Sequence, residues 1–201
     1  FGNCEGVVRL FEDQERKGSF KAWSLLTALS DLSSSDKKNI EQYQNIIEGP
    51  NWLDKRNEDR LYKNREPEVI VVGSGQAGLS IAARLKQQNI DTLIVDKNER
   101  IGDNWRNRYH SLKLHNQTHV NHLPYMPFPS TWPTYIPKDK LAGWFEYYVE
   151  SMELNAWTNT KFIGAEYYEN KKHWKVKLKL SDGTIKIMKP KHIVMAVGVS
   201  S

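Results

Sequence analysis

The chain has 201 residues, of which 39% are hydrophobic and 11% aromatic, a composition sufficient for a globular core. Its 29 basic and 24 acidic residues are mixed along the chain and leave a net charge of +5, so no basic stripe indicates a nucleic-acid partner. The single cysteine, Cys4, excludes an intrachain disulfide and fits the cytoplasm, and no apolar run reaches the roughly 18 residues of a membrane-spanning helix.

Residues 7 to 30 predict a β-hairpin. The segments "VVRLF" and "FKAWSLL" have the composition of strands, and a charged turn that ends in Lys17-Gly18 joins them. An isolated hairpin is only marginally stable in water. We therefore expect these two strands to belong to a larger sheet or to dock on a neighbouring domain.

Residues 33 to 66 are expected to connect this hairpin to the rest of the chain. Serines 33 to 35 offer an N-cap for a short helix that Gly49-Pro50 would end. One face of that helix would be apolar, formed by Ile40, Tyr43 and Ile47. Residues 50 to 66 are rich in charged side chains, and we interpret them as a linker.

A βαβ unit is predicted from Pro67 onward. Four apolar residues at 69 to 72 form a strand, and a glycine turn at 73 to 78 leads into a helical pattern. The segment "IDTLIVD", residues 90 to 96, reads as a second buried strand. A strand, a helix and a second strand in this order give two parallel strands.

The glycine turn has the spacing GxGxxG of a dinucleotide-binding turn. In that turn Gly73 allows the sharp bend, Gly75 lets the backbone approach a pyrophosphate, and Gly78 lets the helix pack on the strand. The phosphates lie at the helix N-terminus, where free N–H groups favour anions. Asp96 ends the second strand, in position to accept hydrogen bonds from a ribose. The alternative is a glycine turn that serves packing alone.

The acid at 96 also narrows the choice of dinucleotide. Asp96 would repel a ribose 2′-phosphate, which disfavours NADP at this turn, although Lys97 partly offsets that charge. NAD and FAD both remain. The chain enters the irregular segment "ERIGDNWRNRYHSLKLHNQ" soon after the acid, where a simple NAD module would continue with helix and strand, and this favours flavin.

The remainder of the chain predicts one helix and four strands. After an irregular, aromatic-rich segment at 101 to 137, a helix has a continuous apolar stripe formed by Leu141, Trp144, Phe145, Tyr148, Val149 and Met152. The segments "KFIGAEYYE", "HWKVKLKL" and "TIKIMK" predict an antiparallel meander. The last segment, "HIVMAV", is apolar enough to return to the parallel sheet.

Three motifs together resemble a known family. "GSGQAGLSIAARL", "LIVDKNERIGDNWRNRYHSLKLH" and "LPYMPFPSTWPTYIPKDKL" are similar to the FAD-binding part of flavin-dependent (class B type) monooxygenases, which include the flavin-containing monooxygenases, the plant auxin-forming enzymes and fungal relatives. The resemblance covers roughly residues 67 to 201. It implies FAD as cofactor, with NADPH expected in the full-length protein, and O2 activation as a flavin C4a-peroxide that the protein shields from water.

The resemblance also implies a set of cofactor-binding residues. The turn would bind the FAD pyrophosphate and the acid the adenosine ribose, while the pair Asn104 and Trp105 would contact the cofactor near its flavin end. Asn116 stands near the place where some members of the family have a flavin-side asparagine. The full set is Gly73, Ser74, Gly75, Gln76, Ala77, Gly78, Asp96, Lys97, Gly102, Asn104, Trp105 and Asn116. No residue is assigned as a general acid or base, because the oxygenation chemistry belongs to the cofactor.

The chain departs from the family pattern at three positions. Asp103 replaces the second glycine of the usual Gly-Gly-x-Trp turn, which puts the local backbone geometry there in question. Val197 replaces threonine in the turn after the last strand. The segment "FIGAEYYENKKH" imitates the FxGxxxHxxxY/W fingerprint of these enzymes, but Tyr168 occupies the histidine position, so the true fingerprint is absent.

Some fungal members of this family carry a cone-shaped NTF2-like domain before the FAD domain, and "VVRLF" with "KGSFKAWSLLTALSDL" resembles its last strands. The predicted fold class is therefore α/β: a Rossmann-like FAD-binding domain with a parallel sheet and a small antiparallel meander, preceded by a fragment of an α+β NTF2-like domain. The expected divisions are 1–32 for that fragment, 33–66 for the linker and 67–201 for the FAD-binding domain.

Two other patterns favour structural roles. His110, His115, His119 and His122 lie in one loop, but their spacing on irregular structure is not typical of a zinc site, so no metal is expected. "PYMPFP" contains a PxxP that could bind an SH3-type groove, but the aromatics around it indicate packing on its own domain.

The sequence therefore predicts the FAD-binding portion of an FAD- and NADPH-dependent monooxygenase that oxygenates a small organic substrate. A second GxGxxG is absent, so we expect the chain to stop before an NADPH-binding domain. Two alternatives stay open: an FAD-dependent NAD(P)H reductase or dehydrogenase without oxygen insertion, and a non-catalytic dinucleotide-binding module. The substrate and the oligomeric state have no signature in the sequence.

Overall fold

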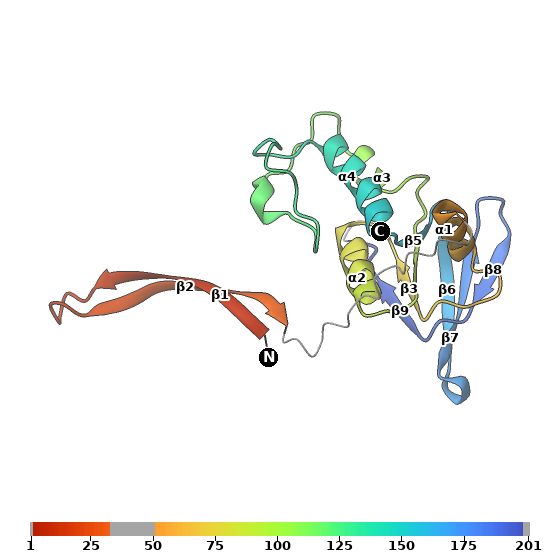
Figure 1. The fold of residues 1–201 in the computed structure, drawn as a ribbon, viewed down its shortest axis with the longest axis horizontal. Coiled ribbons are helices and arrows are strands. Elements are labelled where there is room, and N and C mark those ends of the chain that lie inside the picture. The colour runs from red at the N-terminus through yellow and green to blue at the C-terminus, as the bar shows by residue number, and fades with distance from the viewer. Residues whose placement is uncertain (1, 33–50, 199–201) are drawn as a thin grey trace. The chain divides into compact units, whose positions relative to one another are not determined.

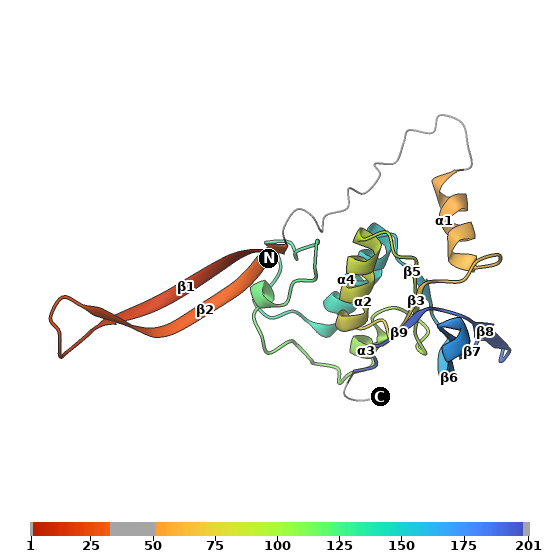
Figure 2. The ribbon, with the colours of Figure 1, turned by 90° about the horizontal axis from the view of Figure 1, so that it is seen from below.

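The computed structural model describes residues 2 to 32 and 51 to 198. The chain divides into two compact units, Phe1–Gln42 and Tyr43–Ser201, which are described separately below (Figures 1 and 2). The short helix expected after serines 33 to 35 lies outside the described residues.

The first unit contains a two-stranded antiparallel hairpin. Strand β1 (Gly2–Glu12) pairs with β2 (Phe20–Leu32), and the ladder has two register irregularities. The predicted hairpin is confirmed, and both strands are longer than the sequence indicated. Many of its large apolar side chains are exposed within the described structure, among them Val7, Phe11, Trp23, Leu25 and Leu26.

The second unit is built on a four-stranded parallel sheet in the order β5-β4-β3-β9. Strands β3 (Val69–Val72) and β4 (Thr92–Val95) form the predicted βαβ unit around helix α2 (Gln76–Gln87). Strand β9 (His192–Met195) pairs with β3 as expected. Strand β5 (Asn155–Trp157), beside β4, was not predicted, because three half-buried residues show no clear periodicity.

Successive side chains along these strands point to opposite faces of the sheet, and each face packs in its own hydrophobic core. Val69, Val71 and Ile94 face helix α2 and helix α4 (Lys138–Ser151). Ile70 and Leu93 face the other way, toward Val176, Leu178 and Met188. Figure 1 shows the consequence within this unit, where helices α2 and α4 lie on one side of the parallel strands and a smaller sheet on the other.

That smaller sheet is the predicted antiparallel meander. Strands β6 (Lys161–Tyr168), β7 (His173–Lys179) and β8 (Ile185–Met188) pair in this order, and the 3-10 helix η3 (Glu169–Lys171) lies between the first two. The meander and the apolar stripe of α4 are both confirmed. The expected helix residues Leu141, Phe145, Tyr148 and Val149 are all buried.

The expected linker over residues 50 to 66 is corrected by helix α1 (Trp52–Leu61). This helix has a very polar composition and docks through hydrogen bonds rather than through an apolar stripe. Arg56 is buried and donates from Nη1 to Asn155 Oδ1 at 3.1 Å and from Nη2 to the Leu154 carbonyl at 3.3 Å. The Tyr62 hydroxyl donates to Asp91 Oδ1 at 2.6 Å. Residues 52 to 62 are therefore part of the second unit.

The segment from 101 to 137 is irregular, as expected, apart from the short helices α3 (Asp103–Arg106) and η2 (Thr118–Val120). The aromatic residues around the PxxP segment pack on their own domain. Phe128 is buried and stacks on Trp132, with ring centroids 4.8 Å apart, and Trp144 of α4 closes the cluster. Among the described helices, none has the length and apolar composition to cross a bilayer.

Candidate dinucleotide-binding site

The glycine turn at the end of β3 is held against the neighbouring strands. Gly73 has φ +104°, a conformation that side-chain-bearing residues rarely adopt, and its N–H donates to the Val95 carbonyl at 2.8 Å. A Cβ on Gly73 would lie 2.5 Å from the carbonyl oxygen of Ala196. The backbone that follows β9 therefore packs directly against the turn, and only glycine fits at position 73.

Gly78 and Gly75 have opposite surroundings. A Cβ on Gly78 would lie 1.9 Å from the Gly73 carbonyl oxygen, so α2 packs on the turn at the distance that only glycine permits. Among the described residues outside Gly75's chain neighbours and its own helix, a Cβ on Gly75 would meet Asn104 Nδ2 alone, at 3.4 Å, which is ordinary van der Waals contact. Of the three glycines, Gly75 is therefore the one that could carry a side chain without a clash inside the protein.

Helix α2 begins without a side-chain cap. Gly75 is the N-cap residue, no side chain accepts a hydrogen bond there, and the first turn contains no acidic residue. The first N–H groups of a helix have no partner within the helix, and the helix dipole makes this end positive. Gln76 and Ala77 are exposed at this end. The arrangement fits an anionic group of the ligand.

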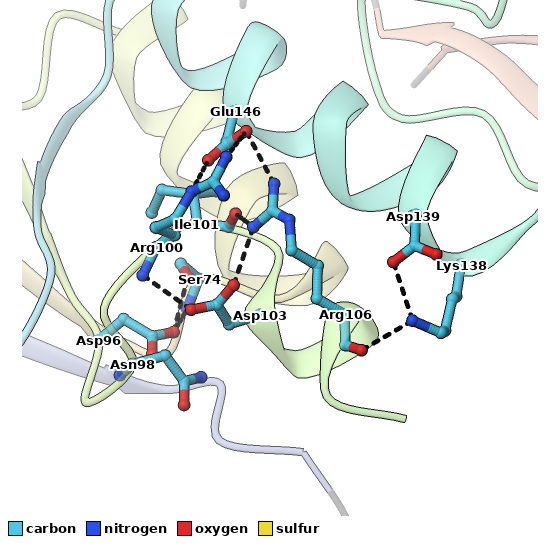
Figure 3. A network of polar contacts seen from close by, with 10 residues as sticks. All are labelled: Ser74, Asp96, Asn98, Arg100, Ile101, Asp103, Arg106, Lys138, Asp139 and Glu146. Atoms are coloured by element: carbon cyan, nitrogen blue, oxygen red, sulfur yellow. Dashed lines mark hydrogen bonds and ion pairs between the residues drawn. The ribbon is translucent and has the colours of Figure 1, made fainter. Parts of the chain in front are cut away.

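Asp96 lies beside the turn and is already hydrogen-bonded to it (Figure 3). Its Oδ2 accepts from the Ser74 N–H at 2.7 Å and from Ser74 Oγ at 2.6 Å, and its Oδ1 accepts from the Asn98 N–H at 2.8 Å. Both Asp96 and Ser74 are buried. A carboxylate has about four acceptor positions, so roughly one remains on Oδ1 for a further donor.

A second turn, at 100 to 106, faces the glycine turn. Gly102 has φ +89°, and a Cβ there would lie 2.6 Å from the Ala142 carbonyl oxygen of α4. Asp103 begins α3 and its carboxylate accepts from the Arg100 N–H at 2.9 Å. The aspartate in place of the usual glycine is therefore accommodated as the first residue of a helix, and Asn104 is left facing Gly75.

The expected cofactor residues do not all gather at one place. The glycine turn, Asp96 and Asn104 lie around the start of α2, and Gly102 packs on Ala142 of α4. Within the described residues, no hydrogen bond or ion pair joins the exposed Lys97 and Asn116 to the turn. The Asn116 carbonyl instead accepts from Asn121 Nδ2 at 3.3 Å. Trp105 packs against the helix-side core, and its buried Nε1 has no hydrogen-bond partner among the described residues.

Three participants were missed by the sequence interpretation. Ala196 closes the turn from β9, although the strand itself was placed correctly. Arg106 and Glu146 form an ion pair of 2.7 Å between Arg106 Nη2 and Glu146 Oε2. No local pattern could have linked those two residues, because α4 is distant from α3 in sequence.

The described residues contain no cluster of three or more histidine, cysteine or acidic side chains suited to a metal ion. His122 has a structural role instead, because its Nδ1 accepts a hydrogen bond from the Phe128 N–H at 2.9 Å and its ring contacts the Phe128 ring.

Part of the second unit matches a known family model. Residues 71–129 match the family described as "NAD(P)-binding Rossmann-like domain". This segment begins within β3 and contains the glycine turn, Asp96 and the second turn. The match agrees with the parallel sheet and with the placement of the turn at the start of α2.

Two curated relatives illustrate the similarity in sequence. An uncharacterized CzcO-like oxidoreductase of Geobacillus kaustophilus is 42% identical over 102 residues, which are 49% of this chain and 28% of the relative. A probable indole-3-pyruvate monooxygenase, YUCCA3 of Arabidopsis thaliana, is 32% identical over 149 residues, which are 72% of this chain and 33% of the relative. The chain spans about a third or less of the length of these relatives.

Two solved structures illustrate the similarity in fold. A flavin-containing monooxygenase from Stenotrophomonas maltophilia has a TM-score of 0.58 at 20% identity, covering 66% of this chain and 38% of that protein. The bacillithiol disulfide reductase Bdr from Bacillus cereus has a TM-score of 0.62 at 17% identity, covering 67% and 40%. The chain therefore has a Rossmann-like fold, contains a segment similar to NAD(P)-binding Rossmann-like domains, and is similar in sequence to monooxygenases.

Proposed function

We propose that this chain is the FAD-binding portion of an FAD- and NADPH-dependent monooxygenase that uses O2 to oxygenate a small organic substrate. One observation carries the proposal. An uncapped helix N-terminus, a buried carboxylate and the Asn104 amide converge on a glycine turn in which Gly75 alone has free space. The similarity to monooxygenases over 72% of the chain favours this chemistry over other uses of a Rossmann-like fold.

The described residues fit FAD in a defined way. The N–H groups at the start of α2 would hold the pyrophosphate, with Gly75 allowing its close approach. The free acceptor position of Asp96 would take one ribose hydroxyl, while its charge would repel a 2′-phosphate. Asn104, across from Gly75, would contact the cofactor beyond the pyrophosphate. Bound FAD, once reduced by NADPH, supplies the oxygen chemistry.

Titration of the purified chain with FAD tests the proposal, with quenching of flavin fluorescence as the signal. We expect saturable binding at one FAD per chain, weakened when Asp96 is replaced by Asn. Titrations with NAD and NADP run in parallel. Tight binding of NAD together with no binding of FAD would contradict the proposal and favour a non-catalytic dinucleotide-binding module.

A reductase without oxygen insertion is the second candidate, and the fold similarity to a disulfide reductase is what favours it. The two candidates differ in what the reduced flavin does. In a full-length protein with FAD bound, NADPH oxidation that yields oxygenated product supports the monooxygenase. Rapid NADPH oxidation with transfer to a disulfide or quinone acceptor, and no oxygenated product, supports the reductase.

Two finer assignments belong to the same proposal. We assign the hairpin β1-β2 to a fragment of an NTF2-like domain that spans residues 1–32. Residues 67–201 are assigned to the FAD-binding domain. Helix α1 is added to that domain, because its buried Arg56 hydrogen-bonds to Asn155. We also place the protein in the cytoplasm, on account of its single cysteine.

A further inference from the structure

We infer that Asp103, Arg106 and Glu146 form a charged clamp that positions Asn104 against the glycine turn, which makes Glu146 of α4 a positioning residue for the dinucleotide site. The inference rests on the proposed function for the identity of the ligand. The clamp itself is a property of the described side chains (Figure 3).

Arg106 is the centre of the clamp. Its Nη1 donates to the Ile101 carbonyl at 2.7 Å and to Asp103 Oδ1 at 2.9 Å, and its Nη2 lies 2.7 Å from Glu146 Oε2. The Arg106 side chain is only 18% exposed and that of Asp103 13%, so water screens this pair less than an ordinary surface pair. One guanidinium thus ties both ends of the 101 to 106 turn to α4.

Glu146 serves two arginines. Its carboxylate accepts from Arg100 Nε at 3.0 Å and from Arg100 Nη2 at 3.1 Å, in addition to its contact with Arg106. These hydrogen bonds raise the pKa of Arg100. The two acids and two arginines balance in charge, so the cluster has no net charge to repel an anionic ligand.

The lysine at the start of α4 holds the same turn from its other side. Lys138 is buried, and its Nζ donates to the Arg106 carbonyl at 2.8 Å and to Asp139 Oδ1 at 2.8 Å. Arg106 is therefore fixed both at its side chain and at its backbone. Gly102 lies directly against Ala142 between these two anchors.

Asn104 lies inside this fixed turn and reaches the glycine turn. Leaving aside the residues adjacent to Gly75 and its own helix, its Nδ2 is the one group of the described structure within 4 Å of a Cβ built on Gly75. The position of the Asn104 amide relative to α2 is thus set by contacts that Asn104 itself does not make. The clamp also explains the departure from Gly-Gly-x-Trp. Asp103 supplies the carboxylate that Arg106 contacts, and a second glycine at this position could not.

The test replaces Glu146 with Gln and compares it with Glu150→Gln as a matched control. Glu150 is on the same helix, loses the same charge and pairs with Arg60 rather than with an arginine of the turn. Without any cofactor, amide hydrogen exchange over residues 101 to 107 should quicken at least several-fold in Glu146→Gln and in Asp103→Asn, and should not change in Glu150→Gln. Unchanged exchange in both clamp variants would overturn the clamp.

The second arm measures FAD affinity in a double-mutant cycle with Asn104. We expect Glu146→Gln to weaken FAD binding about tenfold in the wild-type background and by less than about twofold when Asn104 is already Ala, because the clamp acts through that side chain. Equal losses in both backgrounds would show that Glu146 does not position Asn104. If the wild-type chain binds no FAD, the proposed function fails, and the exchange arm still decides whether the clamp exists.

Discussion

Replacing Gly75 by serine should separate cofactor binding from folding at the glycine turn. Gly75 has φ −73° and ψ −177°, which serine adopts freely, and serine is among the preferred residues at a helix N-cap. Its Cβ would lie 3.4 Å from Asn104 Nδ2, so little must move. We expect the free energy of unfolding to change by no more than about 0.5 kcal/mol.

The same substitution should strongly reduce FAD binding. A serine hydroxyl at the N-cap accepts a hydrogen bond from the N–H groups that would otherwise hold the pyrophosphate, and its Cβ fills the approach. A lost hydrogen bond to a charged group costs about 1.5–3 kcal/mol, which corresponds to roughly a 10- to 150-fold weaker affinity.

Gly78→Ala is the contrasting variant. A methyl group 1.9 Å from the Gly73 carbonyl oxygen meets backbone that cannot rotate away, so it forces α2 away from β3. Overpacking costs about 1–3 kcal/mol or more, and for a backbone contact this short we expect a net loss of about 2 kcal/mol after the roughly 1 kcal/mol gained in helix propensity. Urea denaturation and FAD titration of both variants check the reasoning. It is refuted if Gly75→Ser is as destabilised as Gly78→Ala, or if Gly75→Ser binds FAD like the wild type.

Three further outcomes are expected. Asp96→Asn replaces an acceptor of three hydrogen bonds by an amide that cannot satisfy both Ser74 and Asn98, so the free energy of unfolding should fall by about 1–3 kcal/mol, as measured by urea denaturation. Tyr62→Phe should lower the free energy of unfolding by a similar amount, about 1–3 kcal/mol, and leave FAD affinity unchanged, because its hydroxyl bonds to Asp91 and Asn155 far from the turn. Burial raises the pKa of Tyr62. The contribution of its hydroxyl to the free energy of unfolding is therefore complete below a pH of about 10, where the unfolded tyrosine keeps its proton, and is lost as the pH rises beyond that. Unfolding midpoints should fall less steeply with increasing alkaline pH in Tyr62→Phe than in the wild type, and equal slopes would contradict this.

Elements with a regular apolar pattern were predictable from the sequence. Val69 to Val72 are buried on both faces of a parallel sheet and read as a continuous apolar run. The apolar stripe of α4 and the alternating apolar residues of the meander strands likewise predict which face of each element is buried. In these elements burial is decided by side chains that are close in sequence.

Helix α1 shows where that approach stops. Its docking depends on Arg56 and Tyr62, which find their partners Leu154, Asn155 and Asp91 in distant parts of the chain. A charged helix with one buried arginine has the same local composition as a solvated linker. Only the fold can tell which charged side chain is buried.

The site divides in the same way. The roles of Gly73 and Gly78 follow from the spacing of the turn, and their steric surroundings agree with it. The clamp does not follow from spacing, because Arg100 and Glu146 are 46 residues apart and meet only when α4 packs on the second turn. The hydrogen bond between Ser74 and Asp96 could not be predicted from the sequence either, because the two residues meet only in the folded sheet.

Hydrogen exchange of the chain with and without FAD tests the central claim most directly, because it shows where the cofactor binds. We expect added FAD to slow exchange at residues 74 to 78 at the start of α2, with weaker protection around Asp96 and Asn104. Saturable FAD binding that leaves these three segments unprotected, or protects only other parts of the chain, would contradict the assignment of the glycine turn as the FAD site.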